Sequence, residues 1–289
     1  MSIRVLIVGF GYLAQQLTRL LQHHHHIVWG IKRSSVLQDT RTRMLFKAIH
    51  DLKPGDLPEV DFVVYCPHPD KPTAAAHKSL YLDDLKHLIQ LYRQKESSLP
   101  RRFIHISNCA IYDRHDGEWV DESTPCQPKD RPMQIRLQSE ELAKTMPFPC
   151  TVLRLSGIYG PNRHYLLDQL VDCNAHICFK PQYSNRIHIV DAARAIYHVM
   201  HLRQHEDLYL LTDSEPTPIN TIVAWLSSVT GIKLPTAHRK ESDDAGDQGC
   251  NMRINNSRLL HTGFNFEYRN YHQGFLAILQ EKGMLVKPG

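Results

Sequence analysis

Residues 6–17, LIVGFGYLAQQL, restrict the possible folds more than any other part of the chain. An apolar run reaches Gly9, Gly11 follows, and the small residue Ala14 lies near the start of an amphipathic stretch. A strand that turns through two glycines into a helix is typical of the first unit of a dinucleotide-binding sheet. The first glycine permits the turn, the second lets backbone N–H groups approach a pyrophosphate, and the small third residue lets helix and strand pack closely. The alternative is a glycine turn that binds no ligand.

The rest of the chain alternates between strand and helix patterns. We expect strands over 4–10, 26–32, 44–50, 60–66, 103–107 and 150–158. The intervening stretches predict helices over 12–22, 73–95 and 132–145. Continuous apolar strands separated by helices indicate a parallel sheet that is covered on both faces. The fold class is therefore α/β, a doubly wound Rossmann sheet.

The pattern changes past residue 160. Shorter helices are predicted near 164–173, 219–231 and 271–282, with a strand over 207–212 and a polar loop over 238–250. We expect an NAD(P)-binding domain over 1–163 and a smaller α/β substrate-side subdomain over 164–289. Residues around 185–212 are expected to return to the sheet.

Composition and charge exclude several classes of protein. The 289 residues are 42% hydrophobic and 22% charged, as in ordinary soluble domains, and the net charge is only +4 without a dense basic block. A nucleic-acid surface is therefore not expected. No apolar run reaches the roughly 18–20 residues that cross a bilayer. The seven cysteines are scattered without a CxxC pair, which suggests reduced thiols in a cytoplasmic protein. We also expect no metal site at the surface turn His23–His26.

The end of the second expected strand indicates which nicotinamide cofactor fits. An NAD-specific site places Asp or Glu there to accept a hydrogen bond from the ribose 2′-hydroxyl. This chain has Lys32 and Arg33, followed by two serines at 34 and 35. Cations and hydroxyls suit a 2′-phosphate, so NADP(H) is favoured over NAD(H). A solvated basic loop is the alternative.

Three further segments resemble those of a known family. RLSGIYGPNR (154–163), NRIHIVDAARAI (185–196) and INNSRLLHTGFNF (254–266) are similar to segments of the extended short-chain dehydrogenases/reductases, the NAD(P)-dependent epimerase/dehydratase-like proteins. With the glycine turn, the resemblance covers essentially the whole chain. It implies a seven-stranded Rossmann core, a small C-terminal substrate domain and often a homodimer. It also implies cofactor contacts at Gly9, Gly11, Tyr12, Leu13, Ala14, Lys32, Arg33, Asp51, Cys66, Pro67, Ser107, Arg136 and Leu155.

The catalytic residues that the resemblance implies are only partly present. The family has a Ser or Thr after strand five and a Tyr-x-x-x-Lys on the next helix, in which the Tyr moves the proton. Alignment on Tyr112 places Asn108 at the Ser/Thr position. Alignment on Leu137 and Glu140 places Arg136 at the Lys position and Pro132 at the Tyr position. No tyrosine lies between Tyr112 and Tyr159, so the usual proton donor is missing and the chain resembles atypical members.

The remaining candidates each have a structural alternative. Asn108 is expected to orient a carbonyl, and Arg136 to bind ribose or a phosphate without acting as a base. Cys109 and His68 are the nearest groups for proton transfer, and Tyr112 is a further candidate. The alternatives are a buried filler for Cys109, a loop residue for His68 and a packed ring for Tyr112.

Three more residues are candidates for ligand contacts. Arg163 and Arg186 are in position to meet an anionic or sugar-nucleotide substrate, or else serve as surface or ion-paired arginines. Asp51, at the expected end of strand three, accepts from the adenine amino group or is simply a turn residue.

Two classes of function remain. The first is an NADP(H)-dependent reductase or epimerase-like enzyme that acts on a small carbonyl or sugar-derived substrate with an unusual proton donor. The second is a catalytically inactive NAD(P)-binding regulatory or scaffold protein. Both have a small molecule as the expected partner, with neither nucleic acid nor membrane involved.

Overall fold

The computed structural model describes residues 2–33, 41–95, 98–172, 182–234 and 250–285. The chain forms two compact units that interleave along the sequence. The first unit contains Met1–Tyr112, Pro125–Leu155 and Ala192–Tyr209. The second contains Asp113–Thr124, Ser156–Asp191 and Leu210–Gly289. The expected division of roles, cofactor binding before residue 163 and substrate binding after it, stays a prediction.

A seven-stranded sheet forms the centre of the fold. Its strands are β1 (Arg4–Val8), β2 (Ile27–Lys32), β3 (Arg43–Phe46), β4 (Phe62–Tyr65), β5 (Arg102–Asn108), β7 (Cys150–Leu155) and β11 (Leu208–Leu211). Their order is β11-β7-β5-β4-β1-β2-β3, and the pairs from β3 to β7 are parallel. The chain moves outward from β1 to β3 and then restarts on the other side of β1 with β4. Such a reversal of strand order marks where α/β sheets bind ligands, at the carboxyl ends of the strands.

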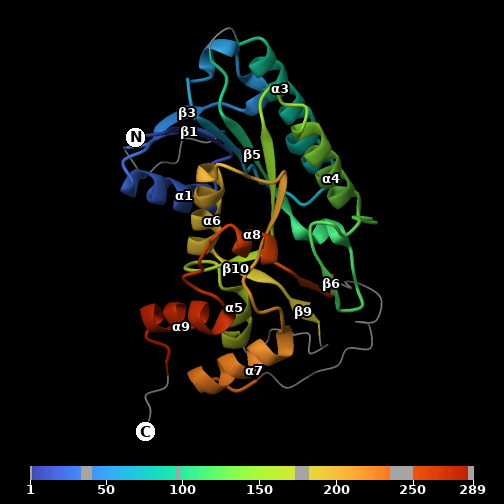
Figure 1. Cartoon of the computed structure of the whole chain (residues 1–289). Helices are drawn as coiled ribbons and strands as arrows, with labels where there is room; N and C mark the ends of the chain where they lie inside the picture. The colour runs from blue at the N-terminus through green and yellow to red at the C-terminus, as the bar shows by residue number, and fades with distance from the viewer. Residues whose placement is uncertain (1, 34–40, 96–97, 173–181, 235–249, 286–289) are drawn as a thin grey trace. The chain divides into compact units, whose positions relative to one another are not determined.

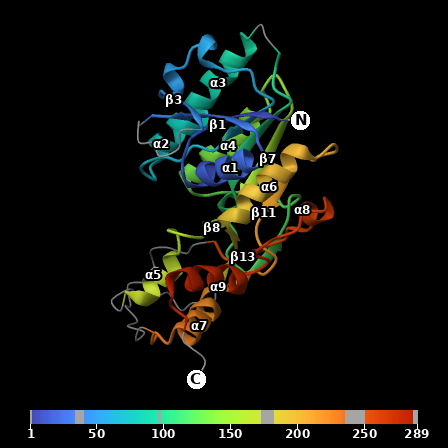
Figure 2. The ribbon, with the colours of Figure 1, turned by 90° about the vertical axis from the view of Figure 1, so that its left-hand side faces the viewer.

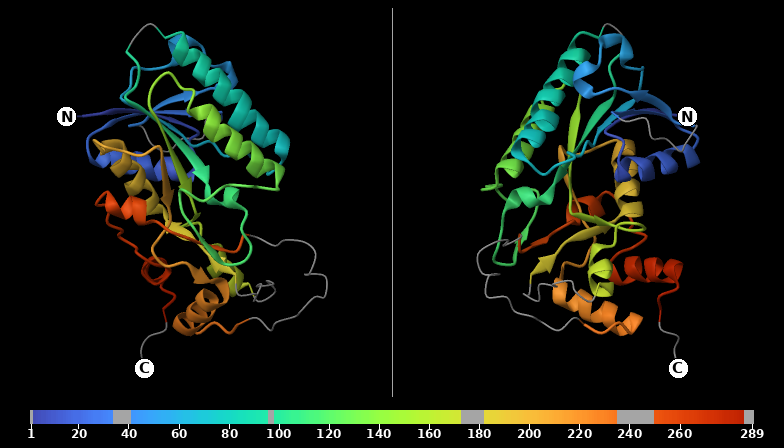
Figure 3. Two further views of the ribbon diagram at one scale, coloured as in Figure 1. Left: turned by 45° about the vertical axis from the view of Figure 1, so that its right-hand side comes forward. Right: turned by 180° about the vertical axis from the view of Figure 1, so that it is seen from behind.

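Helices cover both faces of this sheet. Helices α1 (Tyr12–His23) and α6 (Ile189–His201) lie on one face, and α3 (Asp84–Arg93) and α4 (Arg131–Ala143) on the other (Figures 1 and 3). The four residues Val5–Val8 of β1 are at most 1% exposed, because successive side chains enter opposite cores. Arg102 of β5 donates to the carbonyls of Val199 and Leu202, at and just beyond the end of α6. The doubly wound α/β fold expected from the sequence is confirmed.

Two expected elements differ in extent. The expected strand over 44–50 ends at Phe46, and Ile49–Asp51 forms a 3-10 turn because Ile49 folds into the core. Asp51 is therefore exposed on a turn beyond the strand, and its expected place at the strand end was wrong. The expected helix over 73–95 consists of α2 (Ala74–Lys78), a π-helical turn η3 (Ser79–Asp83) and α3.

The expected strand over 150–158 divides at Ser156. The backbone N–H of Ser156 still bonds to the carbonyl of Leu211, but Gly157–Tyr159 forms β8 and pairs with β10 (Arg186–His188) in a separate ladder. The short strands of the second unit were not expected, because two or three residues carry no readable periodicity. The other two ladders join β9 (Tyr183–Ser184) to β12 (Thr217–Pro218) and β6 (Glu118–Val120) to β13 (Met252–Ile254).

The second unit has its own apolar core. Helices α5 (Tyr165–Val171), α7 (Ile219–Thr230) and α9 (Tyr271–Lys282) enclose it, and a short helix α8 (Ser257–His261) precedes α9 (Figure 2). Its buried residues include Tyr159, Leu170, Leu226 and Phe275. Within the described ranges, no helix combines the length and the apolar composition needed to span a bilayer.

Candidate functional site

Gly9 is fixed by the backbone that passes over it. Its φ of 92° lies in the left-handed region, and its N–H donates to the carbonyl of Ile31 at 3.1 Å. A β-carbon at this position would lie 2.4 Å from the Cα of Pro67, in the segment that follows β4. The Cys66 thiol also donates to the Gly9 carbonyl at 3.2 Å. Only glycine therefore allows β1 and the β4 segment to approach this closely.

Gly11, unlike Gly9, has space for a side chain. It is the N-cap of α1, its φ of −99° suits any residue, and a β-carbon would meet nothing within 4 Å. Within the described part of the chain, no side chain caps this helix, and its first turn holds no acidic residue. A helix N-terminus carries a partial positive charge and N–H donors that point outward. The turn at Gly11 therefore offers space and donors to an anion such as a pyrophosphate.

An ion pair lies beside this turn. Nη2 of Arg33, which follows β2, is 2.6 Å from Oδ2 of Asp70, which follows β4. Both side chains are exposed. Because β2 and β4 are the two neighbours of β1 in the sheet, the pair joins the segments that flank the glycine turn. Sequence reasoning missed Asp70, since nothing in the spacing of 37 residues links it to Arg33.

Arg136 of α4 is a buried cation. Its guanidinium lies 3.9 Å from the ring centre of Tyr81, and Nη1 donates to the carbonyl of Ile106 at 3.5 Å. The Tyr81 hydroxyl in turn donates to the carbonyl of Pro67 at 2.7 Å. Burial lowers the pKa of Arg136, although the guanidinium stays charged. Tyr81, which the sequence reasoning also missed, lies in the π-helical turn η3.

Asn108, Cys109 and Tyr112 are engaged where β5 ends. The side-chain oxygen of Asn108 accepts from the N–H of Ala110 at 2.8 Å and opens the 3-10 turn η4 (Cys109–Tyr112). This leaves the amide nitrogen of Asn108 as its available donor. The thiol of Cys109 donates to the carbonyl of Arg154 at 3.3 Å. Burial raises the pKa of Tyr112 well above its usual value. The catalytic roles expected of these residues stay predictions, and the geometry of Cys109 and Tyr112 favours packing.

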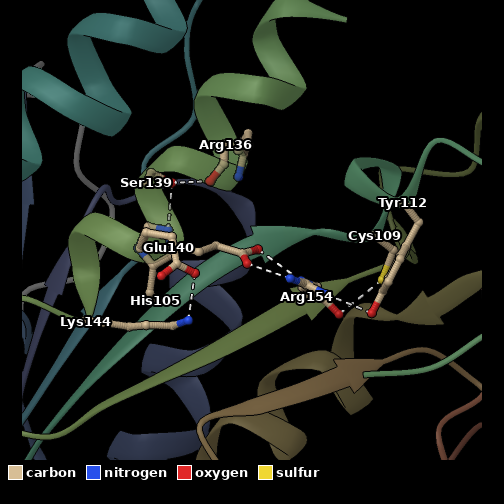
Figure 4. Close-up of polar contacts among 9 residues, drawn as sticks. His105, Cys109, Tyr112, Arg136, Ser139, Glu140, Lys144 and Arg154 are labelled. Atoms are coloured by element: carbon tan, nitrogen blue, oxygen red, sulfur yellow. Dashed lines mark hydrogen bonds and ion pairs between the residues drawn. The ribbon is translucent and has the colours of Figure 1, made fainter. Parts of the chain in front are cut away.

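Tyr112 belongs to a buried ion-pair network (Figure 4). Arg154 of β7 donates from Nε and Nη2 to the two carboxylate oxygens of Glu140 of α4, at 3.1 and 2.7 Å. Its Nη1 donates to the Tyr112 hydroxyl at 2.8 Å. Burial alone would lower the pKa of Arg154, but the hydrogen bonds and charge of Glu140 reverse this and raise it. The network ties α4 to the sheet.

The cofactor candidate Cys66 also holds its proton tightly. Burial raises the pKa of its thiol to about 12, so it is neutral at physiological pH. His68, one of the two nearest candidates for proton transfer, is exposed, and one of its ring nitrogens lies 2.8 Å from the carbonyl of Pro69. A thiol that stays neutral is a poor proton acceptor, and a proton-transfer role for His68 stays a prediction.

The two arginines expected to meet a substrate lie in different environments of the second unit. Arg163 is exposed in a turn that its backbone closes against Gly160. Arg186 of β10 is only 5% exposed, and Nη2 donates to the hydroxyl of Ser184. Burial raises the pKa of the nearby Asp213 to about 8, against the opposing effect of Arg186. Arg186 is thus part of an interior polar group, and its substrate contact stays a prediction.

Buried His105 of β5 is expected to make the stability of the protein depend on pH. Burial, followed by the charge of Arg136, lowers the pKa of His105 to about 3. The unfolded chain binds this proton below about pH 6.5, but the folded chain does not bind it until about pH 3. The contribution of His105 to the free energy of unfolding is therefore fully present above about pH 6.5 and falls as the pH decreases. Between pH 7.5 and 5 we expect this histidine alone to remove about 2 kcal/mol.

The check is urea unfolding of the wild type and His105→Gln at both pH values. The difference in pH dependence between the two proteins isolates this proton, because all other groups are shared. The glutamine variant loses the bond between His105 Nε2 and the Ser139 hydroxyl, so a constant offset is expected at both pH values. An equal pH dependence in the two proteins would contradict the prediction.

The histidine-rich turn after α1 packs against aromatic rings. The rings of His24 and His26 stack on Tyr197 at 4.9 and 5.7 Å between centres. In the part of the chain that the structure describes, no three His, Cys, Asp or Glu side chains are arranged to hold a metal ion.

Comparison with known proteins relates this geometry to a family. No family model matches the chain, and no curated protein matches it. A solved structure from Methylobacillus flagellatus, titled as an NAD-dependent epimerase/dehydratase, is 28% identical, with 98% of this chain and all of that chain covered and a TM-score of 0.79. The chain has the extended short-chain dehydrogenase/reductase fold. The resemblance expected from the sequence is confirmed at this level.

Two further solved structures are similar. A protein of unknown function from Silicibacter pomeroyi DSS is 26% identical, with 97% of this chain and 99% of that chain covered and a TM-score of 0.75. The UDP-glucuronic acid 4-epimerase from Bacillus cereus, solved with NAD, is 16% identical, with 94% and 96% covered and a TM-score of 0.77. The last likeness shows the fold alone.

Within this short-chain dehydrogenase/reductase fold, Pro132 lies in the first turn of α4. The helix is capped by Asp130, whose carboxylate accepts from the N–H of Met133 at 3.2 Å. A proline in the first turn removes no helical hydrogen bond, so the sequence is compatible with the helix. It also leaves no proton-carrying side chain at the position that the family alignment gives to tyrosine.

Proposed function

We propose that this chain is an NAD(P)-binding oxidoreductase or epimerase-like protein that prefers NADP(H) and takes a small carbonyl or sugar-derived substrate. The observation that carries the proposal is the space at Gly11, where no side chain of the described residues caps the N-terminus of α1. Position 9, just before it, has room for glycine only. The Bacillus cereus epimerase with this fold was solved with NAD, which supports a nicotinamide dinucleotide.

The residues around the turn fit the parts of such a cofactor. The backbone from Gly9 to Ala14 would hold the pyrophosphate, and Lys32 and Arg33 would meet a 2′-phosphate. The segment at Cys66 and Pro67, together with Ser107, Arg136 and Leu155, would border the rest of the cofactor. Asp51 remains a candidate for the adenine from its turn, as do Tyr12 and Leu13 for the phosphates.

The bound cofactor would supply or accept a hydride. The chain's own contribution would be to orient the substrate through the Asn108 amide and to place the Arg136 cation nearby. A second function, an NAD(P)-binding protein without catalysis, is favoured by Pro132, because this proline takes the position of the family's proton-donating tyrosine. Substrate contacts at Arg163 and Arg186 belong to the enzymatic alternative.

Cofactor titration followed by a turnover panel tests the proposal. NADPH and NADH are titrated by nucleotide fluorescence, and the loaded protein is then offered aldehydes, ketones and nucleotide sugars while the cofactor absorbance is followed. Turnover of any substrate supports the enzyme. Tight binding without turnover across the panel supports the binding protein, and no binding of either dinucleotide contradicts both.

The ion pair between Arg33 and Asp70 predicts a change in cofactor preference. Asp70→Asn frees the guanidinium for a 2′-phosphate, so we expect NADPH to bind about two- to fivefold more tightly, in the range of an exposed ion pair. Arg33→Met is expected to weaken NADPH binding at least about tenfold while NADH changes little. The measurement is the dissociation constant for each dinucleotide.

Asp56→Asn is the matched control for this pair. Asp56 also pairs with a cation of the first unit, Lys47, at 2.8 Å, but on the turn after β3. Asp56→Asn should therefore leave the affinities for NADPH and for NADH unchanged. If Arg33→Met binds NADPH as well as the wild type does, the assignment of the 2′-phosphate to Arg33 is wrong.

A further inference from the structure

Three buried polar side chains of the first unit each have an atom without a hydrogen-bond partner among the described residues. Arg136, Ser107 and His77 are 8%, 3% and 6% exposed. Among the described residues, Nε of Arg136, Oγ of Ser107 and Nδ1 of His77 are buried and have no hydrogen-bond partner. Leaving such groups unpaired costs free energy, so each requires an explanation.

The charge of Arg136 is the largest of these costs. Within the described residues no carboxylate forms an ion pair with it, and Glu140, which acts on it at longer range, pairs with Arg154. The face of the Tyr81 ring and the Ile106 carbonyl compensate the guanidinium only in part. A buried cation without a counter-ion is strongly unfavourable, which suggests that an anion completes the site.

The cluster lies at the functional edge of the sheet. Ser107 is the next-to-last residue of β5, and Arg136 reaches the carbonyl of the residue before it. Ligands of doubly wound sheets bind at this carboxyl edge. The π-helical turn η3 holds Tyr81 over the guanidinium, and π-helical turns occur frequently at functional sites.

His77 of α2 adds a third polar group. Its ring centre lies 5.4 Å from that of Tyr81. Burial, followed by the charge of Arg136, lowers the pKa of His77, whereas Asp130 raises it and His68 lowers it further. The ring also bonds to the carbonyl of Pro132, which favours the protonated form. His77 was not among the residues predicted from sequence, because a lone histidine on a helix carries no signal.

We propose that Arg136, Ser107 and His77 form a binding site for an anionic oxygen of the small-molecule ligand, a carboxylate or a phosphate. The guanidinium supplies the charge and the hydroxyl supplies a neutral donor, while the imidazole donates from Nδ1 in its protonated form, in which the other ring nitrogen keeps its bond to the carbonyl of Pro132. The proposal rests on the proposed function, because it concerns the same edge of the sheet. The oxygen comes either from a cofactor phosphate or from an acidic group of the substrate.

Stability without ligand gives the first test. Arg136→Met removes a charge that has no counter-ion among the described residues, so the urea midpoint should stay unchanged or rise. Arg154→Met is the matched control, since it removes an equally buried arginine that does have a carboxylate partner, and its midpoint should fall. If Arg136→Met loses as much as Arg154→Met, Arg136 is a structural residue and the proposal fails.

Ligand-dependent stability gives the second test and identifies the source of the oxygen. Sodium phosphate and sodium acetate, compared with sodium chloride at equal ionic strength, should raise the melting temperature of the wild type. The rise should be absent in Arg136→Met and reduced in His77→Gln. If it persists in Arg136→Met, the anions bind elsewhere, for example at α1, and the proposal is overturned.

Saturating NADPH then separates the two sources. If NADPH removes the acetate effect, a cofactor phosphate fills the site; if the effect remains, the site accepts an acidic substrate, and both results support the proposal. A protein that responds to acetate through Arg136 but binds neither dinucleotide would contradict the proposed function and not the anion site. A protein that binds NADPH but shows no anion effect would contradict the anion site alone.

Discussion

Methionine in place of Arg154 is expected to lower the free energy of unfolding by about 3–5 kcal/mol. The substitution leaves the Glu140 carboxylate buried without either of the two hydrogen bonds that it accepts from Arg154. It also removes the donor to the Tyr112 hydroxyl. The cost comes from stranding a charge rather than from losing volume, because methionine fills much of the same space. Urea unfolding followed by circular dichroism measures it.

A double variant distinguishes charge from packing. Arg154→Met combined with Glu140→Leu removes both charges, and replacing a buried pair by apolar residues is often neutral or stabilising. Most of the lost stability should therefore return. A double variant as unstable as Arg154→Met would show that the network acts through shape, and the electrostatic account would be wrong.

The same substitution is expected to cost much more stability at the first glycine of the β1–α1 turn than at the second. Gly9→Val forces a left-handed φ on a branched residue and drives its β-carbon into the backbone of Pro67, so we expect a loss of about 3 kcal/mol or more. At Gly11 a β-carbon would meet no atom of the described residues within 4 Å, so Gly11→Val should cost less than about 1 kcal/mol, mainly through a poorer helix cap.

Dinucleotide binding should show the reverse order for the folded proteins. A valine at position 11 occupies the space in front of the α1 N–H groups, so NADPH affinity should fall at least about tenfold, which is about 1.4 kcal/mol. Gly11→Ala is the graded control and should lose less. Normal NADPH binding by a folded Gly11→Val protein would show that the cofactor does not use this turn, and the proposed function would lose its main support.

The parts of the fold that could be predicted are those in which a local pattern determines the structure. The apolar run of β1 and the spacing of Gly9, Gly11 and Ala14 specify a strand, a turn and a helix within one short segment. The strands β2, β4 and β5 could be predicted in the same way, because burial on both faces makes them largely apolar. The resemblance of three later segments then gave the family fold.

The parts that could not be predicted depend on contacts between distant segments. Asp70 lies far along the chain from Arg33, and His77 reaches Arg136 only because α2 packs on α4. Sequence cannot show that Arg154 pairs with Glu140 while Arg136 pairs with no carboxylate of the described residues, since either arginine could be the partner of Glu140. Asp51 was misplaced for a similar reason: Ile49 turns into the core and ends the strand pattern early.

The interleaving of the two units has a consequence for how the molecule is made. Residues 192–209 belong to the first unit, yet the chain reaches them only after all of Ser156–Asp191 of the second unit has been synthesised. Until then one face of the sheet lacks α6, and the buried guanidinium of Arg102 lacks its carbonyl partners on and beside that helix. On the ribosome, the first unit is therefore an unfinished structure for much of translation. A gene fragment cut at residue 163 would therefore lack α6 and β11.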